Sequence, residues 1–183
     1  MGKMTRRLFA KDYSKDSVSL APWLLGKLLC RNAGGEIIKL RITETEAYYG
    51  EDDTACHAHK GKTKRTSVMY LEGGHSYVFL CYGVHWLFNV VTGKKDFPEA
   101  VLIRGVEGFN GPGKLTKALF IDKELNGENL VESNRIWIEE QKTSQQERLT
   151  PPCGEIFECL KRIGIKYASE EDQNKLWRFV LKN

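Results

Sequence analysis

The chain has 183 residues, which is the size of one domain at about 150 residues per domain. Hydrophobic residues make up 41% of it and the net charge is only +4, so the composition excludes a disordered or fibrous chain. No apolar run approaches the roughly 18 residues of a membrane span, and residues 1–16 lack the pattern of a secretion signal. We therefore expect one domain over residues 1–183, cytoplasmic or nuclear, not secreted, and without a membrane partner.

The first half of the chain predicts a helix followed by a long strand. Apolar residues within 17–30 fall largely on one helical face, which predicts a helix over that range. Residues 36–48 alternate loosely and are rich in Ile and Thr, which predicts a strand. Residues 50–66 are polar and are expected to form a long loop.

The second half predicts an antiparallel meander and then mixed elements. Residues 76–82, 86–92 and 100–106 are β-branched and aromatic runs, separated by Gly83 and a Gly-Lys-Lys-Asp turn. A helix is expected to begin near Pro112, a second to cover 155–164, and a final strand to cover 177–181. Strands with flanking helices and no regular βαβ alternation indicate an α+β domain.

Positive charge gathers in the middle of the chain. Residues 55–105 hold seven cations and three anions: the cations are Lys60, Lys62, Lys64, Arg65, Lys94, Lys95 and Arg104. A surface that faces phosphates needs such a surplus, although a solvated, lysine-rich loop explains the charge equally well. The five cysteines (Cys30, Cys56, Cys81, Cys153 and Cys159) show no Cys-x-x-Cys pair and are expected to be reduced thiols.

Two carboxylates and a phenol lie together near the end of the predicted 36–48 strand. Because side chains alternate along a strand, Glu44, Glu46 and Tyr48 point to one face, which is also what the wet side of an edge strand presents. Tyr77 and Phe79 share a face in the same way. Such aromatic residues usually belong to a core, but beside a carboxylate they can stack a nucleobase while the ionised Glu orients water.

Two other motifs in the chain suggest different chemistry. Cys56, His57 and His59 are zinc-ligand types, but their spacing matches none of the common ligand patterns, so we expect no metal. Residues 108–115 follow the P-loop spacing until Leu115, where a Ser or Thr should hold magnesium, and Pro112 removes a backbone donor. This segment is either a plain helix start or a helix N-terminus that holds one backbone phosphate.

Short blocks in a fixed order then resemble the alkyladenine (3-methyladenine) DNA glycosylase family of the mammalian type. The resemblance runs from about residue 8 to 179, and its blocks are 41–48, 55–57, 77–79, 82–83, 89, 101–104, 111–115 and 175–179. It implies a single α+β domain with a curved, mainly antiparallel sheet flanked by helices. It also implies a monofunctional DNA N-glycosylase without lyase activity, which excises alkylated or deaminated purines from double-stranded DNA without metal or organic cofactor, as a monomer in the nucleoid or nucleus.

The resemblance implies a role for each matched residue. Glu46 falls on the general base that activates water, and Arg104 on a residue that supports the water and the phosphates. The walls of the base pocket would be Tyr48, His57 and Phe79, with Asn89 excluding normal guanine. Tyr82, beside Gly83, would enter the minor groove and fill the gap left by the flipped nucleotide, and Gly111, Gly113 and Lys114 would contact the DNA backbone.

The chain departs from this family pattern in two places. Phe79 stands where the mammalian enzymes have tyrosine, and the segment between Glu107 and Gly111 is shorter than theirs. The mechanism also requires the Glu46 carboxylate to lie open at the floor of a cleft beside Tyr48 and Phe79. Two rival functions use the same residues: a non-catalytic nucleic-acid-binding domain, and a metal-dependent hydrolase.

Overall fold

Pairing between strands that are distant in the sequence organises the fold. The computed structural model describes residues 5–141 and 156–182. The α-helices are α1 (Ser17–Leu24), α2 (Pro112–Ala118) and α3 (Glu170–Asn174), and the short 3-10 helices are η1 (Ala10–Ser14), η2 (His57–Lys60), η3 (Ser67–Tyr70) and η4 (Lys123–Leu125). The strands are β1 (Thr5–Arg7), β2 (Leu28–Ala33), β3 (Glu36–Tyr49), β4 (Ser76–Cys81), β5 (His85–Val91), β6 (Glu99–Val106), β7 (Phe109–Asn110), β8 (Ile136–Gln141), β9 (Phe157–Leu160) and β10 (Arg178–Leu181).

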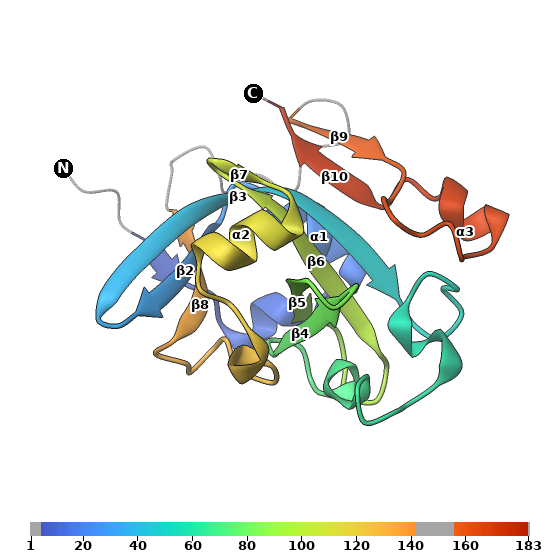
Figure 1. Cartoon of the computed structure of the whole chain (residues 1–183), viewed down its shortest axis with the longest axis horizontal. Coiled ribbons are helices and arrows are strands. Elements are labelled where there is room, and N and C mark those ends of the chain that lie inside the picture. The colour runs from blue at the N-terminus through green and yellow to red at the C-terminus, as the bar shows by residue number, and fades with distance from the viewer. Residues whose placement is uncertain (1–4, 142–155, 183) are drawn as a thin grey trace.

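Strand β3 lies at the centre of the sheet and pairs with β2, β6 and β10. The main path of the sheet is β1-β8-β2-β3-β6-β5-β4, while β10 pairs with both β3 and β9, and β7 pairs with β6. The first half of β3 pairs with β2 and the second half with β6, with a register shift on either side of Glu44 that marks a bulge. Figure 1 shows β3 running in an arc across the molecule, which curls the sheet. The α+β class with a curved, mainly antiparallel sheet is therefore confirmed.

The main core lies between the curled sheet and its helices. Leu20, Ala21 and Leu24 are the buried apolar residues of α1, and Leu115 is buried in α2. Asp16 caps α1 by accepting a hydrogen bond from the Ser19 N–H, and the Thr45 hydroxyl donates to the Ala21 carbonyl at 2.9 Å. The Thr45 contact ties α1 to β3, the strand that carries Glu46.

Two predicted helices were wrong in part or in whole. The helix expected over 17–30 ends at Leu24, because Gly26 takes a positive φ of 81° and Leu28–Ala33 then pairs as β2. The range 155–164, where a helix was expected, holds strand β9 instead, which pairs with β10. Residue 155 lies outside the described residues. In both places, pairing with a distant strand prevails over a local apolar pattern that is compatible with a helix.

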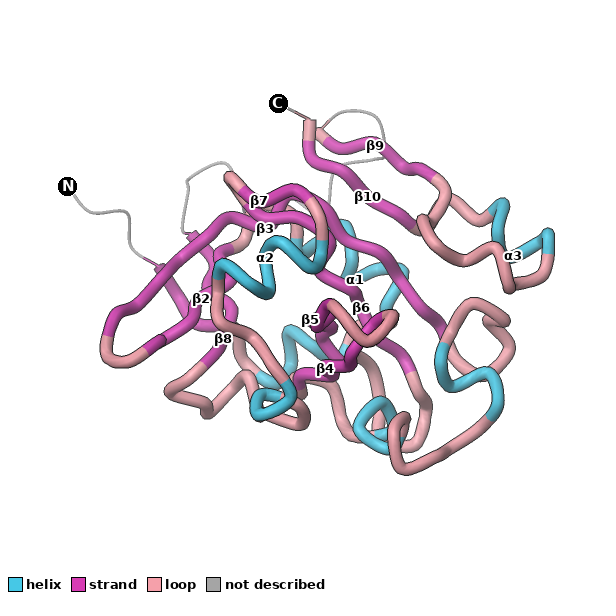
Figure 2. Tube along the Cα trace, viewed as in Figure 1, coloured by secondary structure: helices cyan, strands magenta, loops and turns pink. Residues whose placement is uncertain are grey.

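The remaining expectations about the elements agree with the structure. The meander β4-β5-β6, the helix at Pro112 and a final strand are confirmed. Figure 2 shows that loops and two short helices connect β3 to β4, which includes the expected polar loop. No helix within residues 5–141 and 156–182 is long and apolar enough to cross a membrane. Cys30, Cys56 and Cys81 are free, but Cys159 is disulfide-bonded, so the expectation of five reduced thiols was wrong; Cys153 lies outside the described residues.

Candidate active site

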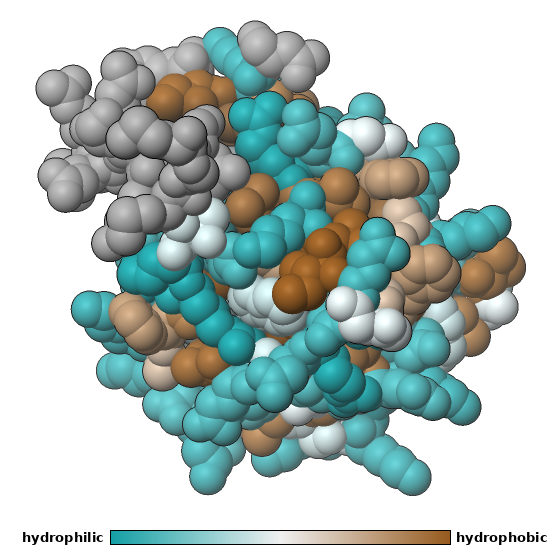
Figure 3. Space-filling view, turned by 90° about the vertical axis from the view of Figure 1, so that its left-hand side faces the viewer, coloured by the Kyte–Doolittle hydropathy of each residue, from teal (hydrophilic) through white to brown (hydrophobic). Residues whose placement is uncertain are grey.

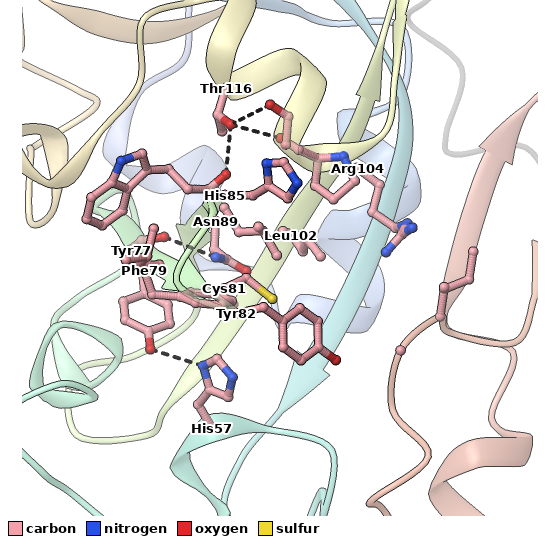
Figure 4. A pocket seen from close by; sticks show the side chains of 18 of the residues that line it. His57, Tyr77, Phe79, Cys81, Tyr82, His85, Asn89, Leu102, Arg104 and Thr116 are labelled. Atoms are coloured by element: carbon pink, nitrogen blue, oxygen red, sulfur yellow. Dashed lines mark hydrogen bonds between the residues drawn. The ribbon is translucent and has the colours of Figure 1, made fainter.

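A cavity of about 1000 Å³ opens between β3, the β4-β5-β6 meander, α2 and the segment that follows β9. Nine of the residues singled out from the sequence line it: Tyr48, His57, Phe79, Tyr82, Asn89, Arg104, Gly111, Gly113 and Lys114. Figure 4 shows Tyr77, Phe79 and His57 gathered on one side and Arg104 on the opposite side. Glu46 and Gly83 are not part of the lining. The structure therefore brings residues from six separate elements (β3, η2, β4, β5, β6 and α2) to one hollow.

Three rings form one wall of the cavity. The rings of His57 and Phe79 meet edge to face with centroids 4.5 Å apart, and those of Tyr77 and Phe79 lie 5.4 Å apart. Tyr77 and Phe79 point together because they are two positions apart on β4. Such a wall offers flat aromatic surface to a planar ligand.

His57 is held in this wall as a neutral ring. Its Nδ1 is hydrogen-bonded to the Tyr77 hydroxyl at 3.1 Å, and an Arg65 nitrogen lies 3.3 Å from each ring nitrogen. Burial lowers the pKa of His57 to about 4, and the Arg65 charge acts in the same direction. His57 therefore carries no charge near pH 7.

Asn89 is fixed at the back of the same wall. It pairs with Tyr77 across β4 and β5, and its side-chain Nδ2 donates to the Tyr77 carbonyl at 3.0 Å. The side chain is buried although it lines the cavity. A single orientation of this amide is therefore presented to the cavity.

Glu46 lies behind the cavity wall, so the expectation of an open carboxylate was wrong. Its side chain is 0% exposed. Oε1 accepts a hydrogen bond from the Ile163 N–H at 2.8 Å, and Oε2 accepts one from the Tyr48 hydroxyl at 2.9 Å. Arg104 Nη1 lies 3.5 Å from Oε1. These three residues cover the carboxylate, and all three line the cavity.

Burial dominates the titration of Glu46 and of its phenol partner. Burial raises the pKa of Glu46, while Arg104, the Ile163 N–H and the Tyr48 hydroxyl oppose the rise. The pKa of Tyr48 is raised well above its ordinary value by burial and by the neighbouring Glu46. Tyr48 therefore remains a hydrogen-bond donor to the carboxylate.

Glu44 balances the charge of two arginines. Its Oε1 accepts hydrogen bonds from Arg104 Nε at 3.1 Å and from Arg178 Nη1 at 2.9 Å. Glu44 and Glu46 thus share one face of β3, as alternation predicts, and Arg104 bridges them. Glu44 orients the Arg104 guanidinium toward the cavity.

The tip of the β4-β5 hairpin carries Tyr82 beside the cavity. Tyr82 is 89% exposed and has a positive φ of 50°, and Gly83 follows with φ of 70°. Positive φ at both central residues is typical of tight hairpin turns, but it is unusual for a bulky aromatic residue. The turn therefore directs a large ring into solvent at the rim.

The start of α2 forms the rim on the other side. Gly111 precedes the helix and its N–H donates to the Arg104 carbonyl at 3.0 Å. A Cβ on Gly113 would lie 2.8 Å from His85 Cγ, so the glycine lets α2 approach β5. Lys114 is exposed there. The structure thus gives Gly113 a packing role besides its predicted DNA contact.

The possible zinc ligands point to different partners. His57 contacts Tyr77, His59 Nδ1 lies 2.7 Å from the Glu51 carbonyl oxygen, and Cys56 is buried with its pKa raised to about 12 by burial. Within the described part of the chain, no group of three or more His, Cys, Asp or Glu side chains is placed to hold a metal ion.

Sequence reasoning missed the segment that covers Glu46. Ile163 supplies the main-chain donor, and Gly164, Ile165 and Tyr167 continue the lining. The segment fell within or beside a predicted helix, and Ile163 lies 117 positions from Glu46. Arg162 follows Lys161 in a basic pair, so no local side-chain pattern marked a buried contact here.

The sequence is similar to those of a known protein family. The methylpurine-DNA glycosylase family model matches residues 11–110 and 107–183. The chain is 44% identical to a Natranaerobius thermophilus protein, with 93% of each chain covered, and 46% identical to a Borreliella burgdorferi protein, with 93% of this chain and 94% of that one covered. A Clostridium perfringens protein is 38% identical over 97% of this chain and 96% of its own.

All three relatives carry the provisional name 3-methyladenine DNA glycosylase. They are bacterial, so the mammalian character of the resemblance stays a prediction. The family model and these relatives each span nearly all of the sequence, including the strands and loops that build the cavity. The chain therefore belongs to the methylpurine-DNA glycosylase family.

Proposed function

We propose that this protein removes alkylated or deaminated purines from duplex DNA by hydrolysing the N-glycosidic bond. The nucleotide is first rotated out of the helix, which costs a few kcal/mol and costs least for a damaged base. Water then attacks C1′ of the sugar, the bond to the purine breaks, and its electron pair leaves with the base. Glu46 accepts the proton from the water.

A carboxylate directly behind an aromatic-walled cavity is the observation that carries this proposal, but Glu46 is covered rather than open, so the reaction requires its cover to shift when DNA binds. Tyr48, Arg104 and Ile163 separate a buried carboxylate from the cavity by one layer of residues. A general base must reach the water within hydrogen-bond distance, though such contacts can form only once substrate is bound. The Arg104 contact is the longest of the three, so we place the water between Arg104 and Glu46, where a small shift of the guanidinium admits it.

The aromatic walls suit the base. A cationic alkylpurine between the Tyr48 and Phe79 rings gains about 0.5–2 kcal/mol from each face as the site dries. Such a base leaves without being protonated, so base catalysis by Glu46 suffices for it. A neutral deaminated purine must in addition gain a proton as it leaves. Asn89, fixed by its bond to Tyr77, would meet the amino group of a normal guanine and exclude it.

Residues at the rim of the cavity would contact the DNA around the flipped nucleotide. Tyr82 would fill the gap left by the base, and Gly83, Gly111, Gly113 and Lys114 would lie along the DNA backbone.

Water is the nucleophile, so the mechanism uses no lysine Schiff base and gives no lyase activity. It also uses no metal and no cofactor, and one copy of the chain holds every residue named here, which is consistent with a monomer.

Glu46→Gln tests the proposal. A general base contributes about 10²- to 10⁴-fold to a rate, and we expect the variant to lose excision by a factor in that range while it still binds the lesion. The measurement is single-turnover excision from a duplex with one hypoxanthine or one alkylated adenine, read by alkaline strand cleavage. Glu158→Gln, on an exposed residue of β9, is the matched control.

Three outcomes would contradict the proposal. Retention of most of the rate by Glu46→Gln removes this residue from the role. Lesion binding without any strand break by the unaltered protein supports a non-catalytic DNA-binding domain. Inactivation by a chelator supports a metal-dependent hydrolase.

A further inference from the structure

A buried arginine stands directly beside the main-chain donor to Glu46. Arg162 Nη1 lies 2.6 Å from Asp53 Oδ2, and Nη2 lies 2.9 Å from Oδ1, which is a bidentate ion pair. The two side chains are 0% and 1% exposed. The next residue is Ile163, whose N–H donates to Glu46.

The same guanidinium ties the segment to β3. Arg162 Nη1 also donates to the Ala47 carbonyl at 2.9 Å, one residue after Glu46. Nη2 donates to the Asp172 carbonyl at 3.2 Å, so residues before and after the segment are connected through one group. Four hydrogen bonds to three different residues fix the position of Arg162.

Two aromatic rings also contact the Arg162 guanidinium. The Arg162 guanidinium lies over the Tyr48 ring and over the Trp177 ring, each with its Cζ 5.0 Å from the ring centroid. One face of Tyr48 is therefore occupied by Arg162, and Tyr48 lines the cavity and donates to Glu46. Arg162 thus contacts Tyr48, one donor to Glu46, and directly precedes Ile163, the other donor.

We propose that Arg162 is a positioning residue that holds the Ile163 N–H and the Tyr48 ring on Glu46, and so keeps the general base aimed. The inference rests on the proposed function of Glu46. A displacement of about 1 Å at such a site can lower a rate by about 100-fold. Loss of a hydrogen bond to the charged form of a carboxylate also raises its pKa.

Several charged and titratable groups face Glu46 from the elements packed around it. They are Glu44 and Tyr48 on β3, Arg104 on β6, and Arg162 and Tyr167 after β9. In an Arg162 variant, all of these groups except Arg162 itself remain. An upward shift of the acid limb of the pH–rate profile therefore reports the loss of the Arg162 hydrogen bonds and ring contacts.

Arg162→Lys is the first test, because lysine keeps the charge but cannot make the bidentate contact. We expect its single-turnover rate at pH 6 to fall by about 10- to 100-fold, less at pH 8, with the midpoint of the acid limb at higher pH. Asp53→Asn keeps the shape and should give a smaller shift in the same direction. Arg6→Lys is the matched control, since Arg6 pairs with Asp12 and Glu140 outside the cavity lining. A lower rate with an unchanged midpoint overturns the proposal.

The Ile163 amide gives a second measurement, which does not depend on activity or on a stable variant. In the unaltered protein we expect slow hydrogen exchange at this amide and an amide proton shift that changes as Glu46 titrates. Glu46→Gln should abolish that change, and Arg162→Lys should speed exchange by about tenfold or more. Fast exchange in the unaltered protein overturns the positioning role, whereas slow exchange without excision overturns only the proposed function.

Discussion

The surroundings of His57 change the pH at which its ring takes up a proton. Its usual pKa of 6.5 falls to about 4 because the ring is buried and lies beside Arg65. Between these two values the unfolded chain binds a proton at this position and the folded chain does not. Stability contributed by the neutral ring is therefore lost as the pH falls from about 6.5 toward about 4, and it stays low below that.

We expect His57→Gln to lose less thermal stability than the unaltered protein when the pH falls from 7 to 5. The reason is that glutamine removes the proton uptake that favours the unfolded chain. Thermal unfolding at the two pH values gives the measurement, with His59→Gln, an exposed histidine, as control. An equal loss in both proteins means that His57 does not cause the pH dependence.

Tyr82 combines high exposure with a positive φ, which stores strain at a residue that packs against little of the fold. Tyr82→Ala should bind a lesion-containing duplex more weakly by about 1–3 kcal/mol if its ring stacks in the gap. Equilibrium binding measures this. Phe120→Ala is a matched control, because Phe120 is also exposed at a positive φ of 51° but lies outside the cavity lining. Equal effects of both changes would exclude a specific role for Tyr82.

Much of the site at this scale could be predicted from the sequence. Strand alternation placed Glu44, Glu46 and Tyr48 on one face, and the family resemblance selected nine residues of the lining. The cover over Glu46 could not be predicted, because its donor Ile163 is a main-chain group and carries no side-chain signal. Burial of a carboxylate depends on such distant partners rather than on its neighbours in the sequence.

Among the elements, the docking of α2 depends on a close approach. A Cβ at Gly113 would lie 2.8 Å from His85 Cγ and 3.0 Å from Nδ1, which is closer than packing allows. The Thr116 hydroxyl donates to the Trp86 carbonyl at 2.7 Å, so the helix is also tied to β5 by a hydrogen bond. The position of the cavity rim follows from these contacts.

Gly113→Ala should destabilise the protein by about 1–3 kcal/mol, the usual cost of an extra methyl group in a packed site. His85→Ala in the same chain should recover part of this, because it removes the ring that the new methyl group would meet. Denaturant unfolding of the two single variants and the double variant measures the coupling. Strict additivity would mean that the two residues do not press on each other.

The wrong predictions of secondary structure concerned short strands that form by pairing with a distant strand. Leu28–Ala33 and Phe157–Leu160 are compatible with helix by apolar spacing, but each becomes a strand against a partner far along the chain. The meander was predictable because its strands are adjacent in sequence and separated by clear turns.

Across the whole molecule, positive charge at the rim comes from more than one part of the chain. Arg65 and Arg104 line the cavity from the basic 55–105 stretch, while Lys114 and Lys117 come from α2. Outside the grey atoms, the face seen in Figure 3 is mostly polar, with smaller apolar areas. The four cations that line the cavity are the feature that suits a polyanion.

Lys114→Met tests this distribution. If Lys114 contacts a phosphate, the slope of log affinity against log salt should decrease in size by about 1, and affinity should fall for damaged and undamaged duplexes alike. Binding at several salt concentrations measures the slope. Lys123→Met, an exposed lysine on η4 outside the lining, is the control. An unchanged slope would remove Lys114 from the interface.

The pairing of β10 with β3 has a consequence for protein synthesis. Arg178 pairs with Glu46 itself, and Ile163 is one donor to that carboxylate, so Glu46 is made on the ribosome long before these two partners. A nascent chain that ends between β6 and Ile163 has neither the Ile163 N–H nor β10 to complete the site. Ribosome-bound intermediates should therefore be inert toward DNA until residues 178–181 have emerged.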